Sequence, residues 1–158
     1  MKLKDWLMTT LFKNFGNVTG EIYRSGQMGR ILLPFFVKRY GIKTIIALNM
    51  DGSNKRETFE MNYCVDHGIH HIRYNWSAGG NSFPGQLDHV VATLEGAYIT
   101  DTPLLIHCAG GKDRTGGALG VWAGKYDHIS KEYWMKMCGL YGIPSEGWLK
   151  VVFKSFSQ

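Results

Sequence analysis

The sequence predicts a single α/β domain, in which a central, largely parallel sheet of four to five strands carries helices on both faces. Two observations predict this class. Short β-branched runs alternate along the chain with longer stretches of helical apolar spacing, the pattern of strands joined by crossover helices. No Pro-, Ser- or charge-rich linker divides the 158 residues, a length that suits one domain with its own core.

Local signals give the expected elements in chain order. Residues 43–48 form a β-branched run of the length of a buried strand, and Gly41 suits the end of the preceding helix. The expected strands are 21–27, 43–48, 70–74 and 103–107, and the expected helices are 31–40, 55–66, 86–98, 115–125, 131–138 and 147–156. Composition also predicts a turn-rich loop at 49–54 and a flexible, Gly-rich loop at 76–84.

Both ends of the chain are expected to be helical. Residues 1–19 are an expected N-terminal helical segment, because Leu3, Leu7 and Leu11 recur at helical spacing. Charged residues interrupt this apolar stretch and no small-residue cleavage site follows it, so it is a poor signal peptide. Residues 126–158 are expected to add C-terminal helices. Nowhere do about 18 consecutive apolar residues occur, so no transmembrane segment is expected.

The number of cysteines and the net charge indicate which cellular compartment and which kinds of binding partner to expect. Cys64, Cys108 and Cys138 form an odd and sparse set, which favours reduced thiols and a cytoplasmic location. None of them has the spacing of a metal knuckle, so no metal is expected. The net charge of +5 fits either a generic solvated surface or a field that draws in anionic substrates. No dense basic run interleaved with aromatic residues occurs, so nucleic acid is not favoured, although it stays open.

The most specific segment is 103–125, where an apolar strand, a Gly-rich loop and a helix follow one another. The strand delivers His107 and Cys108 to its carboxyl end, where open α/β sheets place their sites. The glycines allow a tight loop whose amides face inward, beside the positive end of the next helix. Such a cradle suits a tetrahedral dianion. The residues expected to bind phosphate are Ala109, Gly110, Gly111, Lys112, Asp113 and Arg114.

The same surroundings predict a reactive Cys108. A thiol at a helix N-terminus and beside an arginine has a lowered pKa. Arg114 lies six residues later, where its planar fork can bind two phosphate oxygens. A phosphatase that forms a phosphocysteine on Cys108 is the function this pair predicts. The alternative is a buried, inert thiol, but five fixed positions arise by chance in only about 10⁻⁴ to 10⁻⁵ of chains this long.

The stretch His-Cys-x5-Arg-Thr at 107–115 resembles the signature loop of the protein tyrosine phosphatase superfamily. Its ending, Gly-Lys-Asp-Arg-Thr-Gly, is similar to small bacterial and atypical dual-specificity members, and the likeness runs over about residues 20–125. The resemblance implies the family's fold, phosphotyrosine or phosphoserine and phosphothreonine substrates, and neither metal nor organic cofactor. It makes His107 a supporting residue that orders the loop. Thr115 would stabilise the departing thiolate, and a helix N-cap is its plain structural role.

The resemblance also implies a general-acid Asp on a loop about thirty residues before the cysteine. Here no carboxylate lies between Asp66 and Asp88, so the sequence departs from that pattern. Asp113 is the leading candidate, because some relatives with Lys-Asp-Arg in the loop use that Asp; its alternative role is to hold the loop. Asp88 is the second candidate. The third candidates, histidines able to donate a proton near neutral pH, are His70, His71 and His89.

Lys112 adds positive charge beside the expected cradle. Relatives with Lys at this position often act on phosphoinositides or inositol phosphates. Four other cations are candidates to join it: Arg24, Arg73, Lys55 and Arg56. Three alternatives to a protein phosphatase therefore stay open: a phosphoinositide or inositol-phosphate phosphatase, an RNA 5′-phosphatase, and a catalytically impaired module that binds phosphorylated partners.

Cys64 is a candidate redox partner of Cys108. It lies late in the expected helix at 55–66, a region that in some relatives places a thiol near the catalytic one. A reversible disulfide between the two would protect the nucleophile from overoxidation. The alternative is a buried thiol that packs like a small apolar residue.

Overall fold

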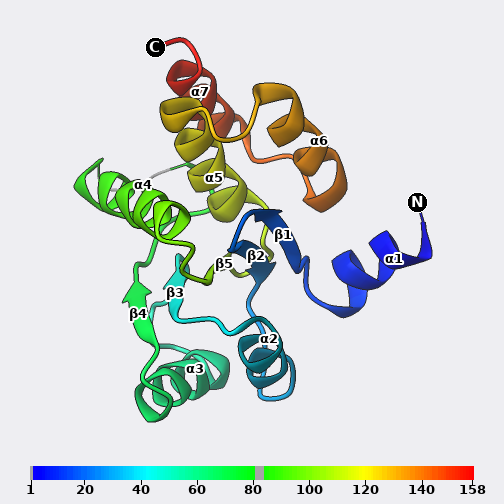
Figure 1. Cartoon of the computed structure of the whole chain (residues 1–158), viewed down its shortest axis with the longest axis vertical. Coiled ribbons are helices and arrows are strands. Elements are labelled where there is room, and N and C mark those ends of the chain that lie inside the picture. Colours follow the sequence, from blue (N-terminus) through cyan, green and yellow to red (C-terminus); the bar gives the residue numbers. More distant parts are fainter. Residues whose placement is uncertain (1, 81–83) are drawn as a thin grey trace.

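A five-stranded sheet with helices on both faces forms the chain's framework, and the computed structural model describes residues 2–80 and 84–158 (Figure 1). The strands are β1 (Gly16–Thr19), β2 (Ile22–Gly26), β3 (Thr44–Ala47), β4 (His70–Arg73) and β5 (Leu104–Cys108). The helices are α1 (Leu3–Trp6), the π-helical turn η1 (Leu7–Leu11), α2 (Leu32–Tyr40), α3 (Lys55–Asp66), α4 (Pro84–Ile99), α5 (Asp113–Tyr126), α6 (Lys131–Tyr141) and α7 (Glu146–Ser155). The predicted α/β class is confirmed.

The sheet brings three strand ends to one edge. Its order is β1-β2-β5-β3-β4, and every neighbouring pair is parallel except β1 with β2. Gly26 at the end of β2 pairs with Cys108 at the end of β5, and Ala47 at the end of β3 pairs with His107. The carboxyl ends of these strands therefore meet at the segment that the sequence marks as functional.

The predicted helical segment at 1–19 is partly wrong. Helical turns occupy residues 3–11, but Gly16–Thr19 forms β1, antiparallel to β2. Gly and Asn have low strand propensity, and β1 pairs on one side only, with a register shift between Asn17 and Thr19. Val18 and Thr19 favour strands, but two such residues are too short a run to predict one, so pairing with β2 decides this strand.

The other predicted elements are present, with ends shifted by three residues or fewer. Gly41 ends α2 with φ 64°, the left-handed conformation expected of a C-terminal cap. The strand and helix around the Gly-rich loop lie where the apolar pattern placed them, although α5 begins at Asp113 instead of residue 115. Residues 81–83 of the predicted loop at 76–84 lie outside the described residues.

Two hydrophobic cores lie on opposite faces of the sheet. One contains residues of α4, α5, α6 and α7, and the other contains residues of α2 and α3, in agreement with the layers in Figure 1. Side chains alternate along β5, so Ile106 and Cys108 belong to the first core and Leu105 belongs to the second. His107 therefore points toward the α3 face while Cys108 points toward the α5 face.

Small residues let α7 approach α5 closely. A Cβ at Gly117 would lie 2.3 Å from the Trp148 ring, and one at Gly120 would lie 2.6 Å from Val152. These glycines therefore set the spacing of the two helices. The close packing also carries the start of α7, with Ser145 at its N-cap, to the first turn of α5.

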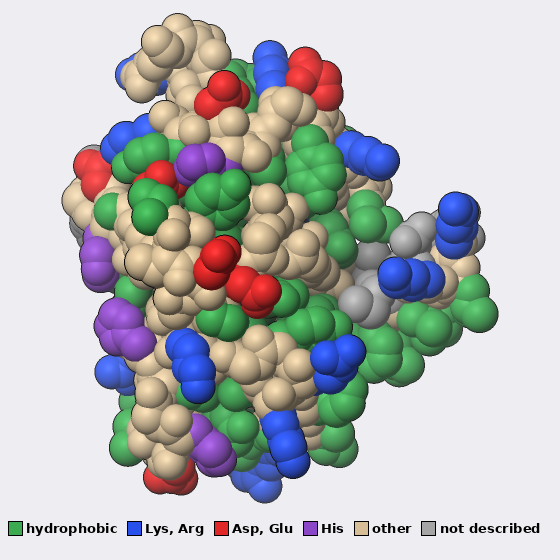
Figure 2. Space-filling model, in the orientation of Figure 1, with side chains coloured by type: hydrophobic (Ala, Val, Ile, Leu, Met, Phe, Trp, Pro, Cys, Tyr) green, Lys and Arg blue, Asp and Glu red, His purple; other side chains and the backbone are tan. Residues whose placement is uncertain are grey.

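Across residues 2–80 and 84–158, no helix has the length and apolarity needed to cross a bilayer. On the face drawn in Figure 2, most Lys and Arg side chains are scattered among side chains of other kinds, and two lie close together at the lower edge. This face therefore offers no continuous basic band of the kind that follows a nucleic-acid backbone.

Candidate active site

The candidate site is the loop that joins β5 to α5 at the carboxyl edge of the sheet. All five residues of β5 are buried, and α5 begins at Asp113, so residues 109–112 form the loop. Because β2 and β3 flank β5 in the sheet, neighbouring strand ends frame the loop on both sides.

The four carbonyl groups of residues 109–112 are all bonded to the surrounding scaffold. The Gln27 amide donates to the Ala109 oxygen at 3.0 Å, Asn14 Nδ2 to Gly110 at 2.7 Å, Arg24 Nη2 to Gly111, and the Gly116 amide to Lys112 at 2.8 Å. Because these oxygens are directed into the scaffold, N–H groups are left to line the centre of the loop. Such a concave ring of amides suits an anion.

Only glycine fits the middle of the loop. Gly111 has φ 67°, in the left-handed region. A Cβ there would lie 2.5 Å from the Gly26 nitrogen and 2.5 Å from the Ser25 carbonyl carbon, so β2 leaves no room for a side chain. Close contact with β2 and an unusual backbone conformation together explain this glycine.

Cys108 is 2 % exposed and its pKa is held below the ordinary value of a thiol. Burial alone would raise that pKa. The side-chain hydroxyl and the amide of Thr115, the Arg114 charge and the Lys112 amide together outweigh burial and favour the thiolate. Apart from Cys108, the Thr115 hydroxyl has no hydrogen-bond partner among the described residues, which fits a hydrogen bond to the Cys108 sulfur.

Arg114 is fixed at one nitrogen and open at another. Its Nη1 donates to the Trp76 carbonyl oxygen at 2.8 Å. Its Nε is buried and has no hydrogen-bond partner among the residues that the structure describes. A guanidinium held in this way keeps donors for an anion in the loop, which is the arrangement a phosphate clamp needs.

Arg24, a predicted substrate-binding cation, is instead part of the scaffold. It is 1 % exposed, bonds the Gly111 carbonyl, and stacks on the Tyr141 ring with its guanidinium carbon 4.5 Å from the centroid. Burial lowers the pKa of Arg24 to about 10, although Tyr141, Cys138 and Cys108 act to raise it. Arg24 therefore remains a cation at neutral pH. It therefore supports the loop from behind and places positive charge near the nucleophile.

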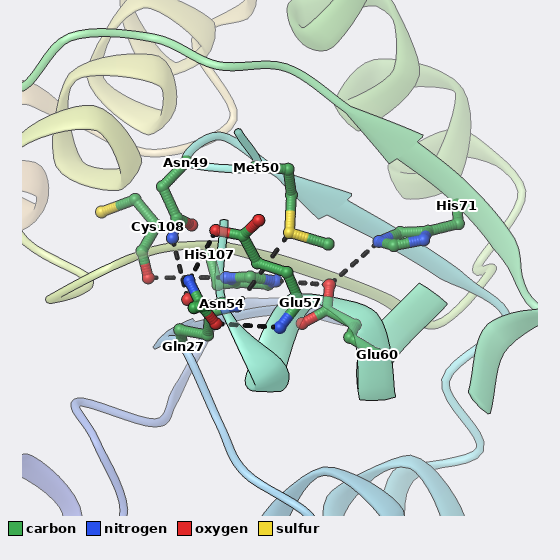
Figure 3. Close-up of polar contacts among 9 residues, drawn as sticks. All are labelled: Gln27, Asn49, Met50, Asn54, Glu57, Glu60, His71, His107 and Cys108. Atoms are coloured by element: carbon green, nitrogen blue, oxygen red, sulfur yellow. Dashed lines mark hydrogen bonds and ion pairs between the residues drawn. The ribbon is translucent and has the colours of Figure 1, made fainter. Parts of the chain in front are cut away.

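The contacts of His107 fit the supporting role that the resemblance implied. Its Nδ1 lies 3.4 Å from the Cys108 carbonyl oxygen, and its Nε2 lies 2.8 Å from Glu60 Oε1 (Figure 3). Glu60 was not predicted to be part of the site. The sequence gives little sign of this role, because a glutamate among the polar residues of α3 is expected to lie on the solvent-exposed face of the helix.

Asp113 has the structural contact that was its alternative role. Its Oδ1 accepts a hydrogen bond from the Ser145 amide at 2.5 Å, and the Ser145 hydroxyl donates to the Ala78 carbonyl at 3.2 Å. Ser145 thus links the first turn of α5 to the loop where the family places its acid. Thr115 is not the N-cap that was expected; α5 starts at Asp113, and Lys112 holds the cap position.

The histidines of β4 do not reach the candidate nucleophile. Across β3, His70 lies level with Leu104 and His71 lies level with Leu105. These two positions of β5 come four and three residues before Cys108. That offset is roughly 10–13 Å along a strand. His71 instead bonds Glu60 on the α3 face. The predicted acid role of these two histidines is therefore wrong on geometry.

Asp88 and His89 lie near the start of α4. Both are exposed, and His89 Nδ1 is 2.6 Å from the Tyr74 hydroxyl. Their helix follows the loop at 76–84, so both remain candidates for the proton donor, ranked after Asp113.

The other predicted cations divide into one that lies away from the loop and three that lie beside it. Arg73 follows Ile72, which packs in the α5-side core, so strand alternation directs Arg73 to the α3 side, away from Cys108. Lys55 and Arg56 are the first two residues of α3, and together with Gln27 they line an open depression. The backbone N–H of Gln27 donates to the Ala109 carbonyl oxygen. This depression therefore borders the loop. Lys112 is exposed at the loop itself.

Cys64 does not lie beside Cys108. It belongs to the core between the sheet and α2 and α3, whereas Cys108 belongs to the core on the other face. Burial and the nearby Glu60 charge raise the Cys64 pKa to about 12, which makes it a poor nucleophile. The arrangement fits the alternative prediction, a buried thiol that packs like an apolar residue, and the predicted redox pairing is not supported.

Fold and loop together define a class: an α/β domain with a thiol of lowered pKa in a loop suited to an anion, at the carboxyl edge of its sheet. Comparison with known families identifies the class. The model of the tyrosine phosphatase family matches residues 10–123, and the chain belongs to that family.

Individual relatives agree with this assignment. The chain is 30 % identical over 113 residues to a Mycosarcoma maydis protein named "Putative tyrosine-protein phosphatase OCA1", covering 69 % of this chain and 68 % of the relative. The catalytic core of the PP-IP phosphatase SIW14 of S. cerevisiae superposes with a TM-score of 0.69 at 22 % identity, covering 89 % and 84 % of the two chains. Tk-PTP superposes with a TM-score of 0.73 at 17 % identity, covering 91 % and 97 %. These structures share the fold, and the family supports a phosphatase activity.

Proposed function

We propose that the protein hydrolyses phosphate monoesters through a covalent phosphocysteine on Cys108. The observation that carries the proposal is a buried thiol of lowered pKa within a loop whose carbonyls are bonded outward. A thiolate in that position faces amides and the Arg114 guanidinium, which suit the equatorial oxygens of a phosphoryl group.

The reaction has two displacements at phosphorus. In the first, Cys108 Sγ bonds to phosphorus, the ester P–O bond breaks, and the leaving oxygen takes a proton from Asp113. In the second, water attacks phosphorus, its proton passes to Asp113, and the S–P bond breaks to restore the thiolate, stabilised by the Thr115 hydroxyl. Arg114 holds the transferred group through both steps.

Turnover of p-nitrophenyl phosphate tests the proposal. The wild-type protein is expected to release a burst of nitrophenolate followed by steady turnover, and Cys108→Ser is expected to do neither while keeping its circular dichroism spectrum. A wild-type protein that binds phosphate or vanadate but shows neither phase would instead be a phosphate-binding module.

The proposed principal substrates are phosphotyrosine and phosphoserine or phosphothreonine in proteins. A second candidate is an inositol phosphate or phosphoinositide, because Lys55 and Arg56 line a depression that borders the loop, where a second phosphate can bind. The SIW14 neighbour, described as a PP-IP phosphatase, is consistent with this candidate. Comparing kcat/KM for phosphopeptides, inositol phosphates and 5′-phosphorylated RNA would rank the alternatives, and Lys55→Gln with Arg56→Gln should lower only the inositol-phosphate value if the second candidate is right.

We propose a cytoplasmic location for the protein. Its three cysteines are all free and buried, as expected in a reducing compartment. Microscopy of a tagged chain would test the location.

A further inference from the structure

Glu60 is a fully buried carboxylate whose role the proposed reaction leaves unexplained. It is 0 % exposed and lies on α3, on the opposite face of the sheet from Cys108. One of its oxygens, Oε1, accepts from His107 Nε2 at 2.8 Å and from His71 Nε2 at 2.9 Å (Figure 3). Its other oxygen has no hydrogen-bond partner within residues 2–80 and 84–158. The polar contacts of this buried charge thus run through two imidazoles.

The contacts of His107 favour a doubly protonated ring. Nε2 faces the Glu60 carboxylate, and Nδ1 faces the Cys108 carbonyl oxygen at 3.4 Å. Both neighbours accept hydrogen bonds and neither donates them, so each ring nitrogen must carry a proton to make its contact. Both contacts are hydrogen bonds together only when His107 is an imidazolium, directly behind the backbone of the candidate nucleophile.

Charge balance supports the same state. A buried carboxylate is costly unless a cation compensates it. The two histidines lower the Glu60 pKa to about 2 although burial opposes this. Burial would lower the His107 pKa, but Glu60 and then Cys108 raise it above its ordinary value. With His107 protonated, Glu60 and His107 form an ion pair whose positive end is next to Cys108.

We propose that Glu60 is a positioning residue of the phosphatase: it keeps His107 protonated and oriented, so that the imidazolium stabilises the Cys108 thiolate from behind the loop. His71 fixes the carboxylate from β4 and completes the network. This role in catalysis rests on the proposed cysteine mechanism. The effect of the network on the ionisation of Cys108 does not depend on that mechanism and can be measured separately.

Among the residues that the structure describes, the titratable groups that interact with this network come from β5, β4 and α3. They are His107 from β5, His71 from β4 and Cys64 one turn further along α3, with Arg73 beyond Cys64. Cys64 stays neutral because burial and Glu60 raise its pKa to about 12. Removing the Glu60 charge should therefore act mainly through the two histidines.

Glu60→Gln tests the proposal, because glutamine keeps an oxygen that can accept from both histidines and removes only the charge. The measurement is the pH dependence of Cys108 alkylation by iodoacetate, which reports the thiolate without needing turnover. Losing a nearby stabilising cation should raise the alkylation midpoint by about one pH unit. The acid limb of kcat/KM for p-nitrophenyl phosphate should move with it. A folded Glu60→Gln with an unchanged alkylation midpoint would overturn the proposal.

Glu57→Gln is the matched control. Glu57 is also buried on α3, one turn earlier, but accepts from the Gly52 amide at 2.6 Å and from Asn54 Nδ2 at 2.8 Å. The same chemical change there should leave the alkylation midpoint of Cys108 in place. An equal shift in both variants would mean a general effect of removing charge from α3 and would overturn the assigned pathway.

A double-mutant cycle tests the route through His107. In a His107→Asn background, Glu60→Gln should shift the Cys108 midpoint no further, because the group through which Glu60 acts is gone. Fully additive shifts would overturn the pathway. If Glu60→Gln does not fold, ¹⁵N chemical shifts of the wild-type protein serve instead: both His107 ring nitrogens protonated at neutral pH support the proposal, and a neutral ring overturns it. A wild type that is alkylated as expected but hydrolyses no phosphate ester would contradict the proposed function alone.

Discussion

Three cysteines in one chain have different chemistry because of what surrounds each. Contacts from Thr115, Arg114 and Lys112 lower the pKa of Cys108 despite its burial. Burial raises the pKa of Cys64 to about 12, with Glu60 adding to the effect, and that of Cys138 to about 11, against the opposing charge of Arg24. Residue type alone therefore says little about reactivity, and the local donors decide it.

Iodoacetate should accordingly modify one cysteine. At neutral pH we expect carboxymethylation of Cys108 alone, because the thiolate is the reactive form and the other two thiols stay protonated. Peptide mass spectrometry after brief treatment of the native protein measures the site. Inorganic phosphate or vanadate should slow the modification by occupying the loop, and labelling of Cys64 or Cys138 first would contradict the assignment.

Asp113→Asn separates the acid from the structural role of this side chain. Asparagine can still accept the hydrogen bond from the Ser145 amide, so the contact to the start of α7 is kept. An alkyl phosphate needs its leaving oxygen protonated, and we expect kcat on such a substrate to fall about 10²-fold or more. An aryl phosphate with a good leaving group should be affected much less. Full turnover of the alkyl phosphate would transfer the role to Asp88 or His89, which Asp88→Asn and His89→Gln would then identify.

The site could be predicted only in part at this scale. Cys108 and Arg114 lie in one short stretch, where spacing and glycines carry the chemistry. Glu60 is 47 positions from its partner His107, and Ser145 is 32 positions from Asp113. Contacts of that separation depend on the fold, and no local pattern marks them. Arg24 was seen as a cation but not as a buried support, because burial too depends on the fold.

Among the elements, β2 has an unexpected share in shaping the loop. It supplies Arg24 to the Gly111 carbonyl, and its end at Gly26 lies against the loop backbone. Apolar runs predicted β3 and β5, whose residues are all buried, and β2 was predicted as a short strand that ends in a Gly turn. Strand β1 escaped prediction because pairing with β2, and not its own composition, makes it a strand.

Gly111→Ala tests the contact between β2 and the loop. The new Cβ would clash with the backbone of residues 25 and 26 and would hold a left-handed conformation that alanine disfavours. We expect a loss of about 2 kcal/mol or more in unfolding free energy, with loss of phosphate binding. Urea unfolding measures it. Gly110→Ala is the stability control, because nothing lies within 4 Å of its Cβ position. Equal stability of the two variants would contradict the described loop.

At the scale of the whole molecule, a buried contact between Glu60 and His107 lies on one face of the sheet, and the candidate nucleophile Cys108 faces the other. The Glu60 pKa is lowered to about 2, so the folded state binds fewer protons there than the unfolded state. Its stabilisation is therefore complete above pH of about 4.5, the ordinary value, and is lost as the pH falls toward 2.

Acid unfolding should show this linkage. The melting temperature of the wild type is expected to fall between pH of about 4.5 and 2, and Glu60→Gln should be less stable at neutral pH but less sensitive to pH in that range. Calorimetry across the range measures both slopes. Parallel curves for the two proteins would show that Glu60 has the same pKa folded and unfolded.

The most direct test of the central claim is to trap the covalent intermediate. A reaction with p-nitrophenyl phosphate, quenched with acid during the burst, should yield a peptide that carries one phosphoryl group on Cys108. Cys108→Ser should yield none under the same conditions. Steady turnover by the wild type with no phosphoryl group on any peptide, or with the group on another residue, would contradict the mechanism.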